Sequence, residues 1–409
     1  MKVVLADPLV RGHHVVHAAY ACEALLARGD EVVFVAWRPH PALAPLSALP
    51  IEMVYAASEA DDDVNQHTLR GQLQMRRVLR SAAAEARRRD AGVIQLLFLD
   101  WFVLGLALAL WAPFLGRGRP RLYAVMYWIY FDRPPGERRG LLVKAKYWLE
   151  RTLLRHSLAS GALTGLFVFD ETVRSRLIGH RFPADAISVI PDPVEVPATV
   201  PDARGARASL GLPTLGPLFL FFGETRLDKG PDILLGALKS VRSPCTVAFI
   251  GPPIDLHDTD FDAIRDRLPA HVSLVWRLER VPDAIVAAHF AAADCVILPY
   301  RRLYLGTSGA MQHAAAYGRP ILMSDVGILG EMTRLHNLGV IVEPESPEAL
   351  AAAIDEFIVA PAEWRADISR SARSYGERND RREYGARMRD RFAKDESGSA
   401  GAMTPVAIG

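Results

Sequence analysis

The sequence has few cysteines, no excess of charge and no export signal. Its three cysteines, at positions 22, 245 and 295, form no CxxC pair, so neither a disulfide framework nor a zinc site is expected. The 48 Lys and Arg residues against 47 Asp and Glu residues give a net charge of +1. This excludes an overall positive electrostatic field that would attract nucleic acid. Since MKVVLADPLV lacks a signal peptide's apolar region and cleavage site, a cytoplasmic protein is expected.

Apolar residues are abundant. They make up 50% of the 409 residues, enough for packed cores, and the length favours two domains over one. The longest apolar stretch, 93–115, approaches the length of a membrane span. A buried strand over 93–99 followed by a core helix ending near Pro113 is the preferred interpretation, and membrane insertion is the alternative.

Strand-like apolar runs alternate with helical patterns in two successive series. Such alternation predicts parallel sheets covered by helices on both faces, so the fold class is α/β with two doubly wound, Rossmann-like domains. The strands are expected at 2–6, 31–36, 93–99, 121–126, 165–169 and 187–190, and then at 218–222, 246–250, 272–275, 295–298, 320–323 and 339–342.

Four prolines within PDPVEVPATVP mark the boundary between the two series. A charged helical pattern and then small residues follow the second series. The expected organisation is an N-terminal domain over 1–190, a linker over 191–201 and a C-terminal domain over 202–375. A helix over 376–394 is expected to pack back on the N-terminal domain, followed by a disordered tail over 395–409.

The segment 138–156 (RRGLLVKAKYWLERTLLRH) combines an apolar stripe at helical spacing with six Arg and Lys residues. A basic amphipathic helix can lie on an anionic membrane surface. The alternative is an ordinary surface helix whose apolar stripe packs on the core. Further positive charge at Arg77, Arg80 and 87–89 favours peripheral membrane contact.

Three loops can carry chemistry, and the first follows the first strand. Gly12 precedes a helix there, and His14 lies beside it. A glycine at this position lets the amides of a helix N-terminus approach a phosphate or a sugar oxygen. A plain strand-to-helix turn is the alternative for Gly12. His14 is a candidate for orienting an acceptor or transferring a proton, although a lone histidine is more often structural.

The second loop follows the strand at 218–222. Gly223 ends this strand, Arg226 and Lys229 follow, and Pro231 begins a helix. Arg and Lys at the carboxyl end of a strand suit an anionic diphosphate. Solvated loop charges are the alternative.

The third loop contains Gly306-Thr307-Ser308-Gly309 and opens an apolar helix that Gly318 ends. Thr307 or Ser308 can cap that helix, and its free amides would face an anion. Simple capping is the alternative, but a plain cap seldom needs a glycine on both sides.

The second and third loops resemble motifs of the retaining GT-B glycosyltransferases often called family four. The run 223–230 is similar to that family's G-x-x-x-x-x-K-G loop, and Gly318-Arg319-Pro320 followed by Gly327 and Glu331 is similar to its G-x-P-V…G-x-x-E stretch. The resemblance extends over most of residues 1 to 390 and is strongest from 218 to 345.

This resemblance implies two domains that face each other across a cleft, with a nucleotide-sugar donor mainly on the C-terminal domain and an acceptor on the N-terminal domain. It implies transfer with retention, without a metal and with no cofactor beyond the nucleotide sugar. The implied donor-binding residues are Gly12, Gly223, Arg226, Lys229, Thr307, Ser308, Gly309 and Glu331.

The sequence also departs from the family. The two glutamates of the family's E-x7-E pair correspond to Leu305 and His313 in this sequence. The family's arginine after the first glycine of the donor loop is replaced by Glu224. A subgroup with a T-S-G turn and the arginine moved to Arg226 fits both changes, but the missing carboxylates leave the donor sugar open. Tyr127 lies near where many relatives carry a histidine, so no catalytic base is assigned.

A glycosyltransferase acting on a polysaccharide, lipid-linked or small-molecule acceptor is the predicted function. The expected location is the cytoplasm, with the inner face of the membrane as an alternative, and no nucleic-acid partner is expected. Two other functions remain open: a sugar-nucleotide epimerase on the same fold, and a non-catalytic partner of another transferase.

Overall fold

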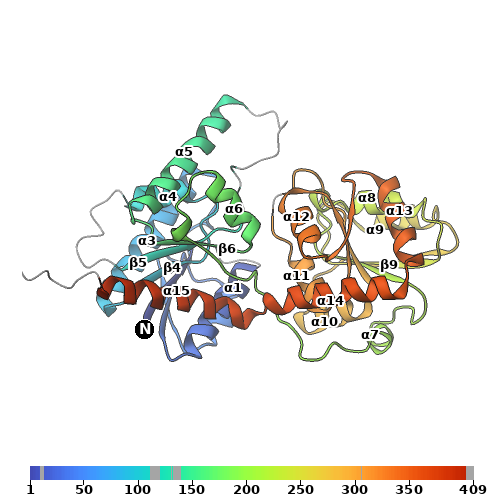
Figure 1. The fold of residues 1–409 in the computed structure, drawn as a ribbon, viewed down its shortest axis with the longest axis horizontal. Coiled ribbons are helices and arrows are strands. Elements are labelled where there is room, and N and C mark those ends of the chain that lie inside the picture. Colours follow the sequence, from blue (N-terminus) through green and yellow to red (C-terminus); the bar gives the residue numbers. More distant parts are fainter. Residues whose placement is uncertain (10–12, 111–119, 130, 132–139, 305, 402–409) are drawn as a thin grey trace, which may run out of the picture. The chain divides into compact units, whose positions relative to one another are not determined.

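The computed structural model describes residues 1–9, 13–110, 120–129, 131, 140–304 and 306–401, and its chain divides into two compact units (Figure 1). Unit 1 comprises Met1–Pro193 together with the segment from Arg381 onward, and unit 2 comprises Val194–Asp380. Each unit has its own parallel sheet.

Unit 1 is built on a seven-stranded parallel sheet in the order β3-β2-β1-β4-β5-β6-β7. Its central strands are runs of β-branched and other apolar residues that are buried on both faces, as expected for a sheet covered by helices. The chain winds outward from β1 to β3 and then crosses to β4 on the other side of β1. The strands are β1 (Lys2–Asp7), β2 (Glu31–Ala36), β3 (Glu52–Tyr55), β4 (Val93–Leu96), β5 (Arg121–Val125), β6 (Gly165–Val168) and β7 (Ile187–Val189).

The helices of unit 1 include the long α3, which packs beside α4. Thr68 caps the N-terminus of α3 by accepting a hydrogen bond from the Gly71 amide at 3.0 Å. The helices are α1 (His13–Leu26), α2 (Ala44–Ser47), α3 (Leu69–Arg89), α4 (Val103–Leu110), α5 (Leu141–Ala159), α6 (Glu171–Gly179) and α15 (Arg381–Gly401), with 3-10 turns η1 (Pro41–Leu43) and η2 (Ala184–Ala186).

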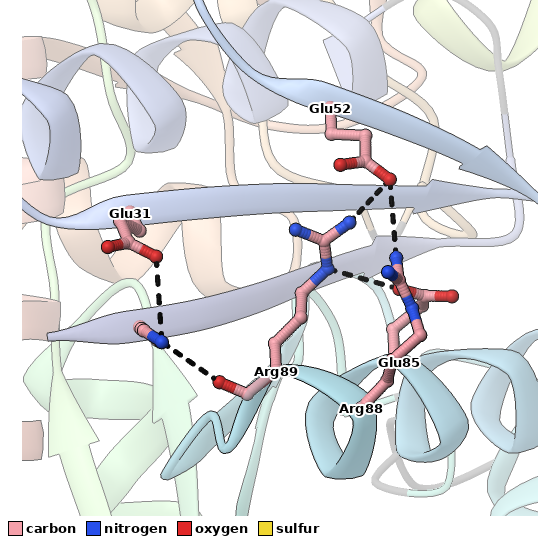
Figure 2. Close-up of polar contacts among 6 residues, drawn as sticks. Glu31, Glu52, Glu85, Arg88 and Arg89 are labelled. Atoms are coloured by element: carbon pink, nitrogen blue, oxygen red, sulfur yellow. Dashed lines mark hydrogen bonds and ion pairs between the residues drawn. The ribbon is translucent and has the colours of Figure 1, made fainter.

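A charged network fastens the end of α3 to the amino ends of the strands (Figure 2). Arg88 and Arg89 both pair with Glu52 of β3 and with Glu85 one turn earlier on α3. The Lys2 ammonium donates to the Arg89 carbonyl at 3.2 Å. Positive charge also suits the carboxyl end of a helix. Two of the arginines expected to favour a membrane surface are therefore already neutralised by glutamates.

The C-terminal helix belongs to unit 1, where α15 lies along α1. The predicted boundaries were wrong: α14 (Ala362–Arg378) takes the start of the expected helix, and α15 continues to Gly401 through the expected disordered tail. Asp395 accepts a hydrogen bond from the Tyr123 hydroxyl at 2.7 Å, and Arg121 donates to the Phe392 carbonyl at 3.0 Å. These contacts with β5 explain why the helix persists. Residues 402–409 lie outside the described ranges.

Unit 2 contains a six-stranded parallel sheet in the order β10-β9-β8-β11-β12-β13. Separate apolar clusters cover its two faces. The strands are β8 (Leu218–Phe222), β9 (Cys245–Ile250), β10 (Val272–Arg277), β11 (Cys295–Leu298), β12 (Ile321–Ser324) and β13 (Gly339–Val342). The helices are α7 (Ala203–Ser209), α8 (Pro231–Leu238), α9 (Asp258–Arg265), α10 (Asp283–Ala292), α11 (Gly309–Ala316), α12 (Gly327–Leu335), α13 (Pro347–Val359) and α14, with the 3-10 turn η3 (Leu227–Lys229).

The predicted doubly wound fold is confirmed for both units, with all twelve expected strands present and β3 added. In the long apolar stretch β4 ends at Leu96 and α4 spans Val103–Leu110, while 111–119 and the expected helix end at Pro113 lie outside the described ranges. Among the helices that the structure describes, none is long and apolar enough to cross a membrane.

Candidate functional site

Each sheet has one place where the winding direction reverses, and doubly wound sheets bind ligands at the carboxyl ends of the strands there. In unit 2 the reversal lies between β8 and β11, and in unit 1 between β1 and β4. The loops that follow β8 and β11 are the second and third loops selected from the sequence. The loop after β1 is the first.

The loop after β8 bends sharply back onto the end of β11. Gly223 has φ +129° and Gly230 has φ +69°, both in the region that glycine alone adopts readily. A Cβ atom on Gly230 would lie 2.0 Å from the Pro299 carbonyl oxygen. Glycine is therefore required at this position for the two loops to approach each other.

Arg226 lies in this loop and is already paired. Its guanidinium donates to both carboxylate oxygens of Asp228, at 3.0 and 2.8 Å, and lies 3.3 Å from Glu224. The hydrogen bond with Asp228 raises the pKa of Arg226. Sequence spacing placed Arg226 in the loop but missed this pairing, so a diphosphate would have to share the guanidinium with Asp228.

Lys229 is the contrasting cation. Among the residues that the structure describes, no hydrogen bond or ion pair reaches its ammonium group. The Lys229 Nζ atom lies 2.9 Å from where a Gly223 Cβ would be, beside the carboxyl end of β8. Burial, and then the nearby charge of Arg226, lowers the pKa of Lys229. The side chain is a half-buried cation, and the nearby carboxylates of Glu224 and Asp228 offset part of this lowering without forming an ion pair with it.

The loop after β11 ends in a capped helix. The Ser308 hydroxyl accepts a hydrogen bond from the Met311 amide at 3.2 Å and lies 2.8 Å from the Tyr300 hydroxyl. Ser308, rather than Thr307, is thus the cap of α11. A Cβ atom on Gly309 would have no neighbour within 4 Å. The first turn of α11 is therefore open, as an anion site requires.

Arg301 joins the two loops of unit 2. Its amide donates to the Asp228 carbonyl at 2.9 Å, and its Nε atom donates to the Leu227 carbonyl at 2.7 Å. A terminal nitrogen of Arg301 also donates to Asp232 on α8 at 2.6 Å. The loops after β8 and β11 are therefore connected to each other, and no sequence pattern indicated Arg301 as the link.

Where the family carries the second glutamate of its pair, the structure places His313 against an aromatic ring. His313 stacks on Phe290 with ring centroids 5.1 Å apart and an interplanar angle of 24°. Leu305 lies outside the described residues. Glu331 is half-buried on α12, after β12, which is the neighbour of β11.

In unit 1, His14 lies against Asp7 at the end of β1. The His14 Nδ1 atom is 3.2 Å from Asp7 Oδ2, and both side chains are buried. His17 lies one turn further along α1, with its Nδ1 atom 2.7 Å from the Tyr127 hydroxyl. Gly12 lies outside the described residues. Asp7 is the partner that sequence spacing did not identify.

Asp100 is a buried carboxyl group that fastens the loops after β4 and β5 together. Its oxygens accept hydrogen bonds from the amides of Tyr127 and Trp128 at 2.8 and 2.7 Å. Burial raises the pKa of Asp100 to about 7, against the lowering effect of these amides. The Asp-Trp break in the apolar stretch was the signal for this loop, although its role was not predicted.

Within the described ranges, no group of three or more His, Cys, Asp or Glu residues is arranged to hold a metal ion. The loop after β8 at the unit 2 reversal point instead brings the cations Arg226 and Lys229 together with the carboxylates of Glu224 and Asp228, and the loop after β11 adds the open first turn of α11. This set suits an anionic ligand that is bound through protein cations and backbone amides.

Comparison with known sequences identifies a match over part of unit 2. The family model described as "Glycosyl transferases group 1" matches residues 216–359. A D-inositol 3-phosphate glycosyltransferase of Xylanimonas cellulosilytica is 29% identical over 225 residues, which cover 51% of this chain and 52% of that protein. A D-inositol 3-phosphate glycosyltransferase of Catenulispora acidiphila is 30% identical over 171 residues, covering 39% and 40%. The chain thus spans about half the length, or less, of these curated relatives.

Solved structures match nearly the whole chain. Anabaena Alr3699/HepE in complex with UDP has a TM-score of 0.71 at 15% identity, covering 96% of this chain and 100% of that one. Sucrose-phosphate synthase of Thermosynechococcus elongatus has a TM-score of 0.71 at 16% identity, covering 97% and 100%. WaaG, a glycosyltransferase of lipopolysaccharide biosynthesis, has a TM-score of 0.63 at 16% identity, covering 95% and 99%. At these identities the likeness establishes the fold.

Proposed function

We propose that this chain, whose fold is the GT-B fold, is a glycosyltransferase that takes a sugar from a UDP-sugar and transfers it to an acceptor. The match to the group 1 glycosyltransferases over 216–359 supports the reaction class. The choice of UDP is supported by Anabaena Alr3699/HepE, whose structures are in complex with UDP, with UDP and glucose, and with UDP-glucose.

Lys229 is the observation on which the proposal rests. A desolvated ammonium group without an ion-pair partner is unfavourable unless a ligand compensates it. Its position at the reversal point, beside the carboxyl end of β8, is suited to a diphosphate. The proposed donor contacts are therefore Lys229, Arg226 and the amides of Thr307, Ser308 and Gly309. Gly223 and Glu331 complete the proposed donor site in unit 2, and Gly12, which lies outside the described residues, stays a prediction from the sequence resemblance.

The proposed chemistry needs the departing diphosphate to be stabilised as the bond to the sugar breaks. Positive charge held in place before the reaction lowers the barrier, because it requires no rearrangement as negative charge develops. Lys229 and Arg226 supply such charge in unit 2. Retention of the anomeric configuration, through a short-lived oxocarbenium-like state, is part of the proposal. The buried pair of His14 and Asp7 is the proposed group for orienting the acceptor or accepting its proton.

A screen of UDP-, GDP- and dTDP-sugars tests the proposal. We expect saturable calorimetric binding of a UDP-sugar, with slow nucleotide release that an acceptor accelerates. Interconversion of the sugar without nucleotide release would instead identify an epimerase. If none of the nucleotide sugars binds, the chain is a non-catalytic partner and the proposed reaction is wrong.

The amino half of α5 supports a second part of the proposal, contact with an anionic membrane surface. Figure 1 shows this half of α5 projecting from the rest of unit 1. Leu141, Leu142 and Trp148 are 84%, 87% and 60% exposed there, and Lys144 and Lys146 lie between them. The carboxyl half packs through buried Leu154 and Leu158. Exposed apolar side chains interleaved with lysines are typical of helices that lie on anionic membranes.

Vesicle sedimentation tests this contact. We expect the protein to sediment with phosphatidylcholine vesicles only when phosphatidylglycerol is included, and to be released by salt, which screens the lysines. The double variant Leu141→Ser/Leu142→Ser should lose most of this binding. Leu215→Ser removes an equally exposed leucine from unit 2 and serves as the matched control. Unchanged sedimentation of the double variant would contradict the proposed contact.

A further inference from the structure

Trp101 has an unfavourable backbone conformation. Its φ is +66°. Among the described non-glycine residues with positive φ, Trp101 is the one with an aromatic side chain. A bulky side chain in this region costs roughly 1–2 kcal/mol. Strain of this kind persists only where the surroundings enforce it, and it concentrates at functional sites.

Two buried polar side chains hold the Trp101 segment in place. Gln72 of α3 donates to the Trp101 carbonyl at 2.6 Å, and its side-chain oxygen accepts from the Gly105 amide at 2.8 Å. On the other side, Asp100 accepts from the amides of Tyr127 and Trp128. The strained turn is thus fixed from α3 and from the loop after β5.

The strain places the Trp101 ring among rings from two other loops. His67 comes from the loop after β3, and its ring centroid lies 5.1 Å from that of Trp101. Trp128 comes from the loop after β5, with its centroid 6.1 Å from Trp101 and an interplanar angle of 85°. His67 is exposed and both tryptophans are half-buried. All three loops follow strands of one parallel sheet, so the rings gather at its carboxyl edge.

The ring group adjoins the reversal point of unit 1. Tyr127 precedes Trp128 and lies 5.4 Å from Phe98, whose centroid is in turn 4.5 Å from that of His14. Neighbouring rings therefore lead from Tyr127 to the His14 and Asp7 pair, and Tyr127 is the sequence neighbour of Trp128. A ligand on this surface would lie near the buried side chains of His14 and Asp7.

We propose that Trp101 and Trp128 form the surface on which a saturated, hydroxylated six-membered ring of the acceptor packs, with His67 able to hydrogen-bond to its hydroxyls. The faces of indole rings carry partial negative charge and attract C–H groups, whose hydrogens carry partial positive charge. A saturated ring presents C–H bonds along both of its faces, so it suits packing against an indole face. The identification of the ligand as an acceptor rests on the proposed transferase function.

Trp101→Gly is the decisive variant, because glycine removes the indole and also relieves the positive φ. Trp128→Leu removes the second indole, and Trp364→Ala in α14 is a control at a partly exposed tryptophan of unit 2. Saturation-transfer NMR would use methyl α-D-glucopyranoside and myo-inositol as probes, with sorbitol as a linear control and phenol as a flat one. UDP affinity would be measured in parallel by calorimetry.

We expect the ring C–H protons of at least one cyclic probe to receive saturation from the wild-type protein, and sorbitol to receive little. Trp101→Gly and Trp128→Leu should reduce the cyclic signal at least fivefold, with UDP affinity unchanged. The Tm of Trp101→Gly should stay within about 4 °C of wild type, since relieved strain offsets lost ring contacts. A purely structural role for the indole would instead lower Tm.

The proposal is overturned if neither cyclic probe is detected with wild-type protein, if both variants retain the signal, or if phenol binds in preference. The UDP affinity shows whether a failure concerns the ring-binding surface or the proposed transferase function. Cyclic-probe binding without any nucleotide binding would refute the transferase reaction and leave the ring-binding surface standing. Nucleotide binding without cyclic-probe binding would refute the ring-binding surface and leave the transferase proposal standing.

Discussion

Lys229→Met should weaken UDP binding about 30-fold or more while leaving the protein equally or more stable. Removing one partner of a desolvated charge interaction typically costs 2–5 kcal/mol of binding, and 1.4 kcal/mol corresponds to a factor of ten. Without ligand, however, Lys229 is a half-buried charge whose pKa burial lowers, so its replacement by a similar apolar side chain relieves a penalty. Calorimetry with UDP and thermal unfolding without ligand measure the two effects.

The pH dependence should identify the same ammonium group. Since burial lowers the pKa of Lys229 in the folded protein, its penalty on stability is fully present below that pKa and fades as pH rises towards the ordinary value of 10.5. The stability advantage of Lys229→Met should therefore shrink at alkaline pH. UDP affinity of the wild-type protein should also fall there, because the ammonium loses its proton.

Lys239→Met is the matched control for Lys229→Met. Lys239 is an exposed lysine at the end of α8 in the same unit, so its replacement should change neither UDP affinity nor stability measurably. Equal loss of affinity in both variants would show a general charge effect. If Lys229→Met binds UDP with wild-type affinity, the diphosphate does not bind at this loop.

Gly230→Ala should destabilise the protein by about 3 kcal/mol or more. The added methyl group would lie 2.0 Å from the Pro299 carbonyl oxygen, on a residue with φ +69°, so the alanine variant combines backbone strain with a clash against backbone. Because Gly230 joins η3 to α8, relief would require the loop after β8 to move away from β11. A fall in Tm of roughly 6–12 °C is expected for a unit of this size.

Gly309→Ala is the companion variant, with the opposite expected pattern. A methyl group there meets no atom within 4 Å, and alanine favours a helix over glycine, so stability should be unchanged or slightly raised. The methyl group would, however, cover the open first turn of α11. UDP affinity should fall about tenfold if a phosphate binds there, which is near 1.4 kcal/mol. Unchanged affinity would rule out this helix end as the diphosphate site.

Most of the fold was predictable because continuous apolar strands alternate with helices. β3 was missed because Glu52–Tyr55 is a short edge strand whose residues are half-buried or exposed, and so lacks the apolar run that marks the others. The persistence of α15 through Gly401 could not be predicted either. The contact of Tyr123 with Asp395 joins residues far apart in sequence, and small polar residues alone favour disorder.

The candidate site was predictable at the level of loops and less so at the level of partners. Glycine positions marked the turns after β8 and β11, because those turns need positive φ or close approach. Local spacing did not indicate that Asp228 would form an ion pair with Arg226. It also did not indicate that Lys229 would have no ion-pair partner among the described residues. Trp101 was invisible as a strained residue, since a tryptophan in an apolar stretch carries no signal for positive φ.

The order of the two units along the chain has a consequence for synthesis. Unit 2 is a continuous segment inserted into unit 1, and its ends meet where the Val194 amide donates to the Asn379 carbonyl at 3.0 Å, beside the bridge to Asp380. Domains tend to fold as units while the chain emerges from the ribosome. Every residue of unit 2 emerges before Arg381, whereas unit 1 begins first and receives α15 last. Unit 1 is therefore synthesised first in part but completed only after the whole of unit 2.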